Sequence, residues 1–63
     1  MLIKFLRRKK GLSQMALAEM LKVSQGAISQ WESGTTKPSL KHLLMLSSIF
    51  SCSINELFEK REG

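Results

Sequence analysis

The sequence predicts a compact all-α fold of five short helices in a single domain of 63 residues. Apolar residues recur at intervals of three and four along most of the chain, which is the spacing of one helix face. Strand signals are poor, because the chain has no tyrosine, few valines or isoleucines, and no sustained alternation of apolar and polar residues. It has one proline and neither repeats nor low-complexity segments. We therefore expect one domain over residues 1–63, without a second domain for ligand sensing, cleavage or catalysis.

The first two helices are predicted from this spacing and from one capping residue. The apolar positions of the first helix are Leu2, Ile3 and Leu6. We expect this helix to end near Gly11. Ser13 is a good N-cap for the second helix, because a serine hydroxyl can accept a hydrogen bond from a backbone N–H of the first turn. One face of the second helix is formed by Leu17, Ala18 and Leu21.

The third helix is short and follows Ser24, another N-cap residue. Its apolar positions are Ile28 and Trp31. This spacing places the tryptophan in the core rather than against a partner molecule. The helix should end at Ser33 and Gly34, since glycine readily takes the left-handed conformation that terminates helices. A loop over residues 35–38 follows.

The last two helices also follow serines. Ser39 caps a fourth helix that carries Leu40, Leu43, Leu44, Leu46 and Phe50. Ser53 and Glu56 form a complete capping box for a fifth helix. That helix carries Ile54, Leu57 and Phe58. We expect Cys52, which lies just before it, to be a small core residue rather than a reactive thiol.

The segment between the second and third helices carries the first functional indication. Only Lys22, Val23 and Ser24 separate them, and so short a turn forces the helices to cross steeply, as in a helix-turn-helix unit. Ala18 supplies the small residue that a steep crossing needs. We therefore predict a helix-turn-helix over residues 14–33, with its last helix over about 25–32. The face of that helix opposite the apolar positions is polar and uncharged, and it consists of Gln25, Gly26, Ser29 and Gln30.

At these residues the sequence resembles the phage-repressor and Cro type of helix-turn-helix DNA-binding domain, also called the xenobiotic-response-element family. The matching stretches are Leu6-Arg7, Gly11-Leu12-Ser13-Gln14, Leu17-Ala18, Val23-Ser24, Ile28-Ser29-Gln30, Glu32-Ser33-Gly34, Pro38-Ser39-Leu40 and Ser53 through Phe58. A lone helix-turn-helix match is a weak signal, whereas the full set in register covers essentially the whole chain and is specific. The resemblance implies a five-helix, lambda-repressor-like fold whose third helix enters the major groove of DNA.

The resemblance also implies roles for individual residues. The positions that match base contacts are Gln25, Gly26, Ser29 and Gln30. The expected contacts to the DNA backbone are Gln14, Ser24, Ser33, Thr35, Thr36, Lys37 and Lys41. The chemistry agrees, because a glutamine amide can form two hydrogen bonds to one adenine, whereas phosphate contacts set position rather than sequence. Gln14 matches a residue that binds a phosphate and can also brace the first glutamine of the third helix.

Two further sets of residues match structural features of the family. Arg7 and Glu32 match an ion pair that ties the first helix to the end of the third. Relatives pair through the region of the fifth helix, where Ile54, Leu57 and Phe58 form a dense apolar cluster. One short chain is not expected to bury all of this cluster, so we expect a homodimer that binds a palindromic operator.

Charge is consistent with a polyanionic partner. The net charge is +5 and the isoelectric point is about 9.9. Residues 1–41 carry eight Lys/Arg and two Glu, whereas residues 42–63 carry two and three, so one part of the chain presents the positive potential. A solvated basic surface without a partner explains charge alone equally well. The stretch 24–36 holds no Lys or Arg, so phosphate contacts must come from its flanks, above all from Lys37.

The sequence therefore predicts a sequence-specific, double-stranded DNA-binding regulator of transcription, most simply a repressor of Cro-like prophage type or of antitoxin type. An antitoxin would have a protein partner as well. The alternative is a protein-interaction module that keeps the fold without reading DNA. In that alternative, Phe5, Met15 and Met20 form an adaptable apolar patch.

Several other classes are excluded or disfavoured. One histidine, one cysteine and no aspartate cannot assemble a familiar catalytic constellation, so we expect no enzyme. His42 stands alone, and we expect no metal and no cofactor. No apolar run is long enough to span a membrane. A single cysteine excludes an intrachain disulfide and fits a cytoplasmic location.

Overall fold

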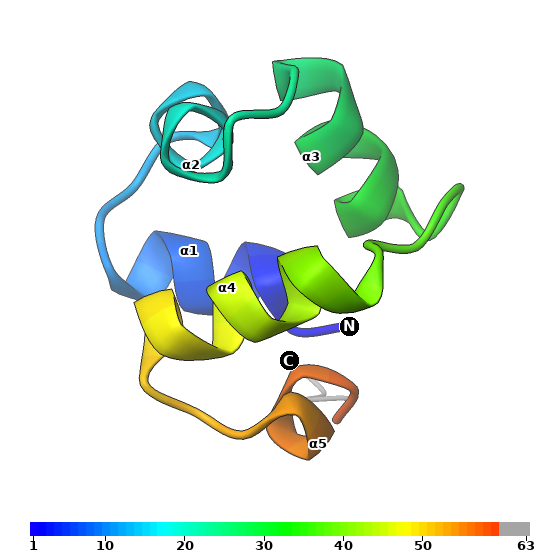
Figure 1. Ribbon diagram of the computed structural model, residues 1–63. Coiled ribbons are helices and arrows are strands. Elements are labelled where there is room, and N and C mark those ends of the chain that lie inside the picture. The colour runs from blue at the N-terminus through cyan, green and yellow to red at the C-terminus, as the bar shows by residue number, and fades with distance from the viewer. Residues whose placement is uncertain (60–63) are drawn as a thin grey trace.

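Residues 1–59 form five helices, as the sequence predicts (Figure 1). The structure is a computed structural model that describes residues 1–59. The helices are α1 (Ile3–Lys9), α2 (Gln14–Leu21), α3 (Gln25–Ser33), α4 (Leu40–Phe50) and α5 (Ile54–Leu57). Helices α2 and α3 lie on one side of α1 and α4, and α5 lies on the other side (Figure 1). Within residues 1–59 there is no strand, and no helix is long and apolar enough to cross a membrane.

The start of each helix after the first is fixed by a serine, which confirms the capping predictions. Each serine hydroxyl accepts a hydrogen bond from the backbone N–H three residues later. The four capping residues are Ser13, Ser24, Ser39 and Ser53. The capping box is also confirmed, since the Glu56 carboxylate accepts from the Ser53 backbone N–H at 3.2 Å. Local chemistry alone therefore sets these helix boundaries.

Left-handed residues end three of the helices. Gly34 terminates α3 with φ of 82°, as its position in the sequence predicts. Lys22 terminates α2 with φ of 58°, and Ser51 terminates α4 with φ of 53°. A residue with a side chain is strained in this conformation, at a cost of about 1–2 kcal/mol relative to a right-handed one. The left-handed Lys22 lies in the short turn between α2 and α3.

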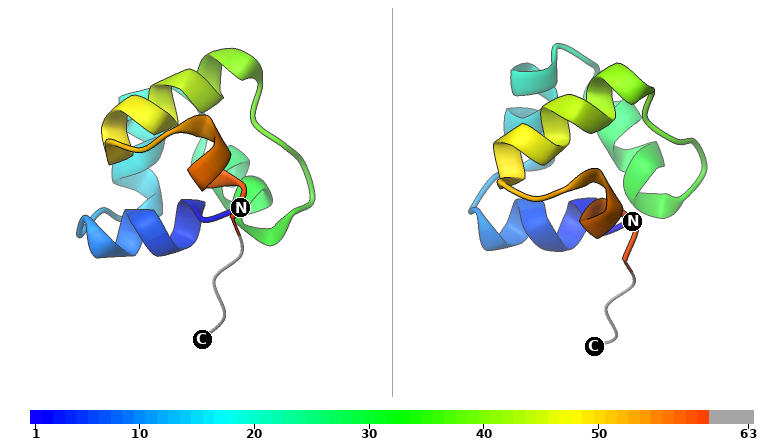
Figure 2. Two further views of the ribbon diagram at one scale, coloured as in Figure 1. Left: turned by 90° about the horizontal axis from the view of Figure 1, so that it is seen from below. Right: turned by 60° about the horizontal axis from the view of Figure 1, so that its bottom comes forward.

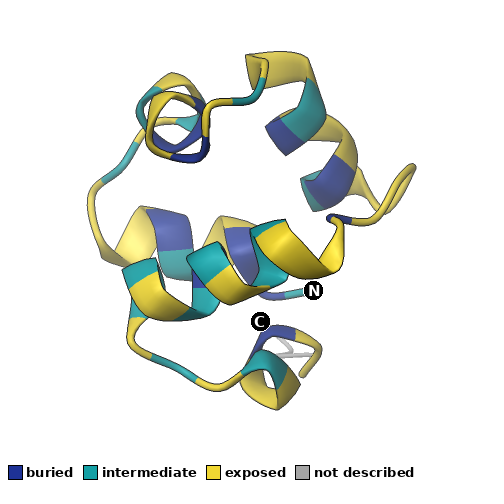
Figure 3. Cartoon of the chain, viewed as in Figure 1, coloured by how far each residue is buried: buried dark blue, intermediate teal, exposed yellow. Residues whose placement is uncertain are grey.

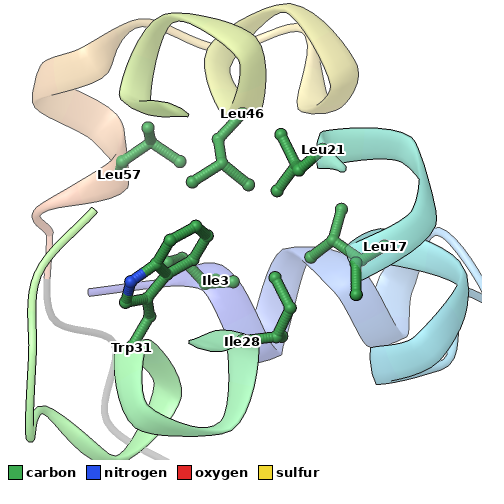
Figure 4. Close-up of a cluster of buried hydrophobic side chains, with 8 residues drawn as sticks. Ile3, Leu17, Leu21, Ile28, Trp31, Leu46 and Leu57 are labelled. Atoms are coloured by element: carbon green, nitrogen blue, oxygen red, sulfur yellow. The ribbon is translucent and has the colours of Figure 1, made fainter. Parts of the chain in front are cut away.

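The core draws on all five helices (Figure 4). Its buried residues are Ile3, Leu17, Ala18, Leu21, Ile28, Trp31, Leu46 and Leu57. Trp31 is buried, as predicted, and Cys52 packs half-buried against the cluster. Burial raises the pKa of the Cys52 thiol, so a smaller fraction of it is the reactive thiolate at neutral pH. Leu40 and Leu44 are exposed, so the apolar residues of α4 extend beyond the face that the core covers (Figure 3).

The expectation for Leu57 is wrong. We expected it to lie on a dimer surface, but its side chain is 0% exposed within a single chain. The Leu57 carbonyl also accepts a hydrogen bond from the Leu2 backbone N–H at 2.8 Å, which holds α5 against the start of the chain (Figure 2). Leu57 therefore anchors α5 to the core. Of the predicted cluster, Ile54 is half-buried and Phe58 is exposed.

Candidate nucleic-acid interface

The predicted helix-turn-helix is present over the expected residues. Helices α2 and α3 are joined by residues 22–24, and α3 ends at Ser33, one residue beyond the predicted boundary. The Val23 backbone N–H donates to the Ala18 carbonyl at 3.0 Å, which closes the turn against the end of α2. Ala18 is buried where the two helices meet. The short turn and the buried Ala18 therefore bring α2 and α3 together as the sequence predicts.

Helix α3 is divided between the core and the surface. Its Ile28 and Trp31 side chains are buried, and Gln25, Gly26, Ser29 and Gln30 are all exposed (Figure 3). The four residues predicted to contact bases therefore share the outer side of one helix. A Cβ atom at Gly26 would meet only the Ser24 hydroxyl oxygen, at 3.8 Å, so the fold itself does not require glycine there.

The Arg7–Glu32 ion pair predicted between the first and third helices is confirmed. The Arg7 Nε donates to Glu32 Oε2 at 2.7 Å, and Nη2 donates to Glu32 Oε1 at 3.2 Å. The remaining nitrogen, Nη1, donates to the Leu12 carbonyl at 2.8 Å. The two side chains are only 10% and 5% exposed. The pair is therefore bidentate and largely shielded from water.

The two charges stabilise one another. The hydrogen bond to Glu32 raises the pKa of Arg7 above its ordinary value, despite partial burial. Burial alone would raise the pKa of the Glu32 carboxyl. Hydrogen bonds from Arg7 and Gln14 and the positive charges of Arg7 and Lys4 outweigh this effect, so the pKa lies below its ordinary value. Glu32 is consequently a carboxylate at neutral pH.

A second hydrogen-bonded path leads from Glu32 to the surface. The Gln14 Nε2 donates to Glu32 Oε1 at 3.0 Å, and the Gln25 Nε2 donates to Gln14 Oε1 at 3.4 Å. The contact between the two glutamines agrees with the bracing that the family resemblance implies. The link from Gln14 to Glu32 was missed, because these residues lie on different helices and no sequence signal connects them.

The loop after α3 is organised around Gln30. Its carbonyl accepts from the backbone N–H groups of Thr35 and Thr36, at 2.9 and 3.4 Å, and from the Ser33 hydroxyl at 3.1 Å. The Thr36 hydroxyl donates to the amide oxygen Oε1 of Gln30 at 3.5 Å. Lys37 is exposed in this loop. The structure thus brings the predicted backbone-contacting loop next to the last predicted base-contacting residue.

The N-terminal end of α4 lies after this loop and presents Lys41 to solvent. His42 does not stand in a metal site. Its Nδ1 is 2.9 Å from the Ser39 hydroxyl, and its ring lies against Trp31 with centroids 5.4 Å apart. Within residues 1–59, no group of three His, Cys, Asp or Glu is placed to hold a metal ion. The histidine therefore has a packing role.

Comparison with known proteins identifies the family. A family model described as helix-turn-helix matches residues 3–57. The chain belongs to this helix-turn-helix family, of the phage-repressor and Cro type. It contains the helix-turn-helix unit that transcriptional regulators of this family share. This membership favours DNA binding over the interaction-module alternative, although Phe5, Met15 and Met20 are indeed exposed.

Three curated relatives of this chain are regulators of transcription or a phage repressor. The chain is 47% identical to the HTH-type transcriptional activator BcrR of Enterococcus faecalis, over 90% of this chain and 28% of the relative. It is 43% identical to repressor protein C2 of Salmonella phage P22, over 84% of this chain and 24% of the relative. It is 39% identical to the HTH-type transcriptional regulator DicA of Escherichia coli, over 81% of this chain and 38% of the relative. The chain therefore spans between about a quarter and two fifths of these proteins.

Proposed function

We propose that this protein is a transcriptional repressor that binds a specific duplex DNA sequence with α3 in the major groove. One observation carries the proposal. The outer side of α3 offers four exposed, uncharged residues, and its inner side is locked into the core. The major groove admits an α-helix, and it is the groove in which all four base pairs can be told apart. We assign the base contacts to Gln25, Gly26, Ser29 and Gln30.

Backbone contacts would come from both sides of this helix. Gln14 and Ser24 lie at the N-terminal ends of α2 and α3, where free backbone N–H groups favour anions. Lys37 supplies the positive charge that α3 itself lacks. The full proposed set is Gln14, Ser24, Ser33, Thr35, Thr36, Lys37 and Lys41. These contacts would set the position and orientation of α3 without reading sequence.

We propose repression because it requires only that the bound domain occupies a promoter, whereas activation requires a further productive contact. The relatives include regulators of both kinds, since one is named an activator and another a repressor. A Cro-like prophage regulator is the simplest type. An antitoxin type would in addition bind a protein partner, and it shares the same DNA-binding surface.

We further propose that two copies bind one palindromic operator through the region of α5. Phe58 is 47% exposed, and Ile54, four residues before it in the sequence, is half-buried. Residues 42–55 contain no Asp, Glu, Lys or Arg, although the whole chain carries a charge of +5. Two copies that meet through this uncharged stretch avoid most of the repulsion between their basic surfaces. Two-fold pairing would match half-sites about one helical turn, ~34 Å, apart.

Selection of bound duplexes from a random pool tests the proposal. The expected result is one enriched motif with two-fold symmetry, and Gln25→Ala should lose preference at one base pair of each half-site. An enriched motif without symmetry would contradict the dimer. A pool without any enriched motif, bound by a folded protein, would contradict sequence-specific recognition.

A further inference from the structure

A series of side-chain hydrogen bonds connects Glu32 to Gln25, one of the residues of α3 proposed to contact bases. The series begins at the shielded Arg7–Glu32 pair, passes through Gln14, and ends at the exposed Gln25. The three side-chain links measure 2.7, 3.0 and 3.4 Å. Each of these hydrogen bonds has a donor and an acceptor, so the series fixes which way each side-chain amide is turned as well as where it lies.

The direction is set at Glu32. An ionised carboxylate can only accept hydrogen bonds, and Arg7 together with Gln14 keeps Glu32 ionised. Gln14 must therefore turn its NH₂ group toward Glu32. Its carbonyl oxygen consequently points toward Gln25, as the 3.4 Å contact from Gln25 Nε2 shows. The reverse orientation of Gln14 would place its oxygen against the carboxylate, and two acceptors would face each other.

The same logic continues to Gln25. One N–H of its amide is used by Gln14 Oε1, which leaves one N–H donor and the oxygen acceptor for a base. Adenine presents the matching pair in the major groove, an N7 acceptor and an N6 donor. Guanine presents two acceptors, N7 and O6, and its O6 would meet the Gln25 oxygen.

We propose that Glu32 is a positioning residue that fixes the orientation of the Gln25 amide and thereby favours adenine over guanine at the base that Gln25 faces. The inference rests on the proposed function, because it requires Gln25 to contact a base. Glu32 itself does not touch DNA in this account, and its effect passes through Gln14.

Glu32→Gln is the direct test, because a glutamine at position 32 can accept or donate. Gln14 and Gln25 are then free to reverse together, and a reversed Gln25 offers both N–H groups to guanine. The measurement is the ratio of Kd values for two duplexes that differ only by guanine in place of adenine at the base pair identified with Gln25→Ala. A good bidentate pair corresponds to a ratio of about 5- to 150-fold in the unmodified protein. We expect Glu32→Gln to reduce this ratio by at least about 3-fold.

Two further variants separate positioning from stability. Arg7→Lys weakens the ion pair but keeps the carboxylate at position 32, so it should lower the melting temperature and leave the ratio unchanged. Gln14→Met interrupts the series and leaves the ion pair intact, so it should reduce the ratio at nearly unchanged melting temperature. Titrations at 10 °C, with circular dichroism to verify folding, allow the comparison. Gln14→Met provides the same test where Glu32→Gln does not fold.

The outcomes distinguish the inference from the proposed function. A ratio that stays at its original value in Glu32→Gln, or that falls as far in Arg7→Lys, overturns the positioning role. A ratio that is unchanged in folded Gln14→Met overturns it as well. If Gln25→Ala changes preference at no base pair, the assignment of Gln25 to a base is wrong and the proposed recognition surface fails with it.

Discussion

Arg7 and Glu32 lie 25 positions apart in the sequence and join through two hydrogen bonds, of 2.7 and 3.2 Å, between one guanidinium and one carboxylate. The pair fixes the end of α3 to α1. Its planar, two-point geometry resists rotation in a way that a single contact would not. The outer side of α3 is therefore held in one orientation relative to the body of the protein before any DNA is bound.

Removing either partner of this pair should destabilise the protein strongly. Arg7→Met or Glu32→Met leaves the other charge without its partner in a shielded site, and such a loss costs about 3–5 kcal/mol. The double variant should lose less than the sum of the two single variants. Urea denaturation of all four proteins at 10 °C gives the coupling free energy. Additive losses would show that the two side chains do not support one another.

Stability should depend on the protonation of Glu32. Because the pKa of Glu32 is lower in the folded chain than in the unfolded one, its contribution is complete above the ordinary glutamate value of about 4.3 and is lost as the pH falls through the folded pKa. The difference in melting temperature between the unmodified protein and Glu32→Gln should thus be constant above about pH 5 and shrink below it. Melting curves between pH 3 and pH 7 measure this difference. Two curves that remain parallel to the lowest pH would contradict a lowered pKa.

Gly26→Ala should stabilise the free protein and weaken DNA binding. An added Cβ atom meets only the Ser24 hydroxyl, at 3.8 Å, and alanine in place of glycine within a helix is worth about 0.5–1 kcal/mol. In a domain of this size this corresponds to a rise in melting temperature of about 2–8 °C. The same methyl group would crowd a base edge, so affinity for the selected duplex should fall. A lower melting temperature would show that α3 does not pack as described here.

Which features could be predicted depends on how far apart in the sequence the interacting residues lie. Helix starts at the capping serines and the end of α3 at Gly34 are decided by neighbouring residues, and these were predicted. The burial of Leu57 and the link from Gln14 to Glu32 depend on how distant segments meet in three dimensions. The Arg7–Glu32 pair is equally distant, and it was predicted only because the chain resembles a family in which that pair occurs.

Phe58→Glu should weaken self-association. The side chain is 47% exposed at the end of α5, three residues beyond the uncharged stretch 42–55, and two glutamates facing each other there would repel. Sedimentation of the free protein, and stoichiometry on a palindromic duplex, should both shift toward one copy. Met20→Glu is the matched control, because Met20 is 46% exposed on α2 and adds the same charge away from the surface in question. Equal stoichiometry for both variants would place the interface elsewhere.

Sequence recognition and sequence-independent DNA affinity should be separable by substitutions at two residues. Gln25 faces outward at the first turn of α3 and would contact a base, which discriminates by about 1–3 kcal/mol. Lys37 lies in the loop beyond α3 and would contact a phosphate, which adds affinity whatever the sequence. Gln25→Ala should therefore weaken binding to the specific duplex alone, and Lys37→Ala should weaken binding to every duplex.

Titration of these two variants on the selected duplex and on a scrambled one, at several salt concentrations, tests the central claim most directly. For Gln25→Ala we predict a loss of preference with a nearly unchanged dependence of log Kd on log salt. For Lys37→Ala we predict an equal loss on both duplexes and a slope smaller by about one unit per monomer. If Gln25→Ala weakened both duplexes equally, or if Lys37→Ala affected only the specific one, α3 would not read the major groove in the orientation proposed here.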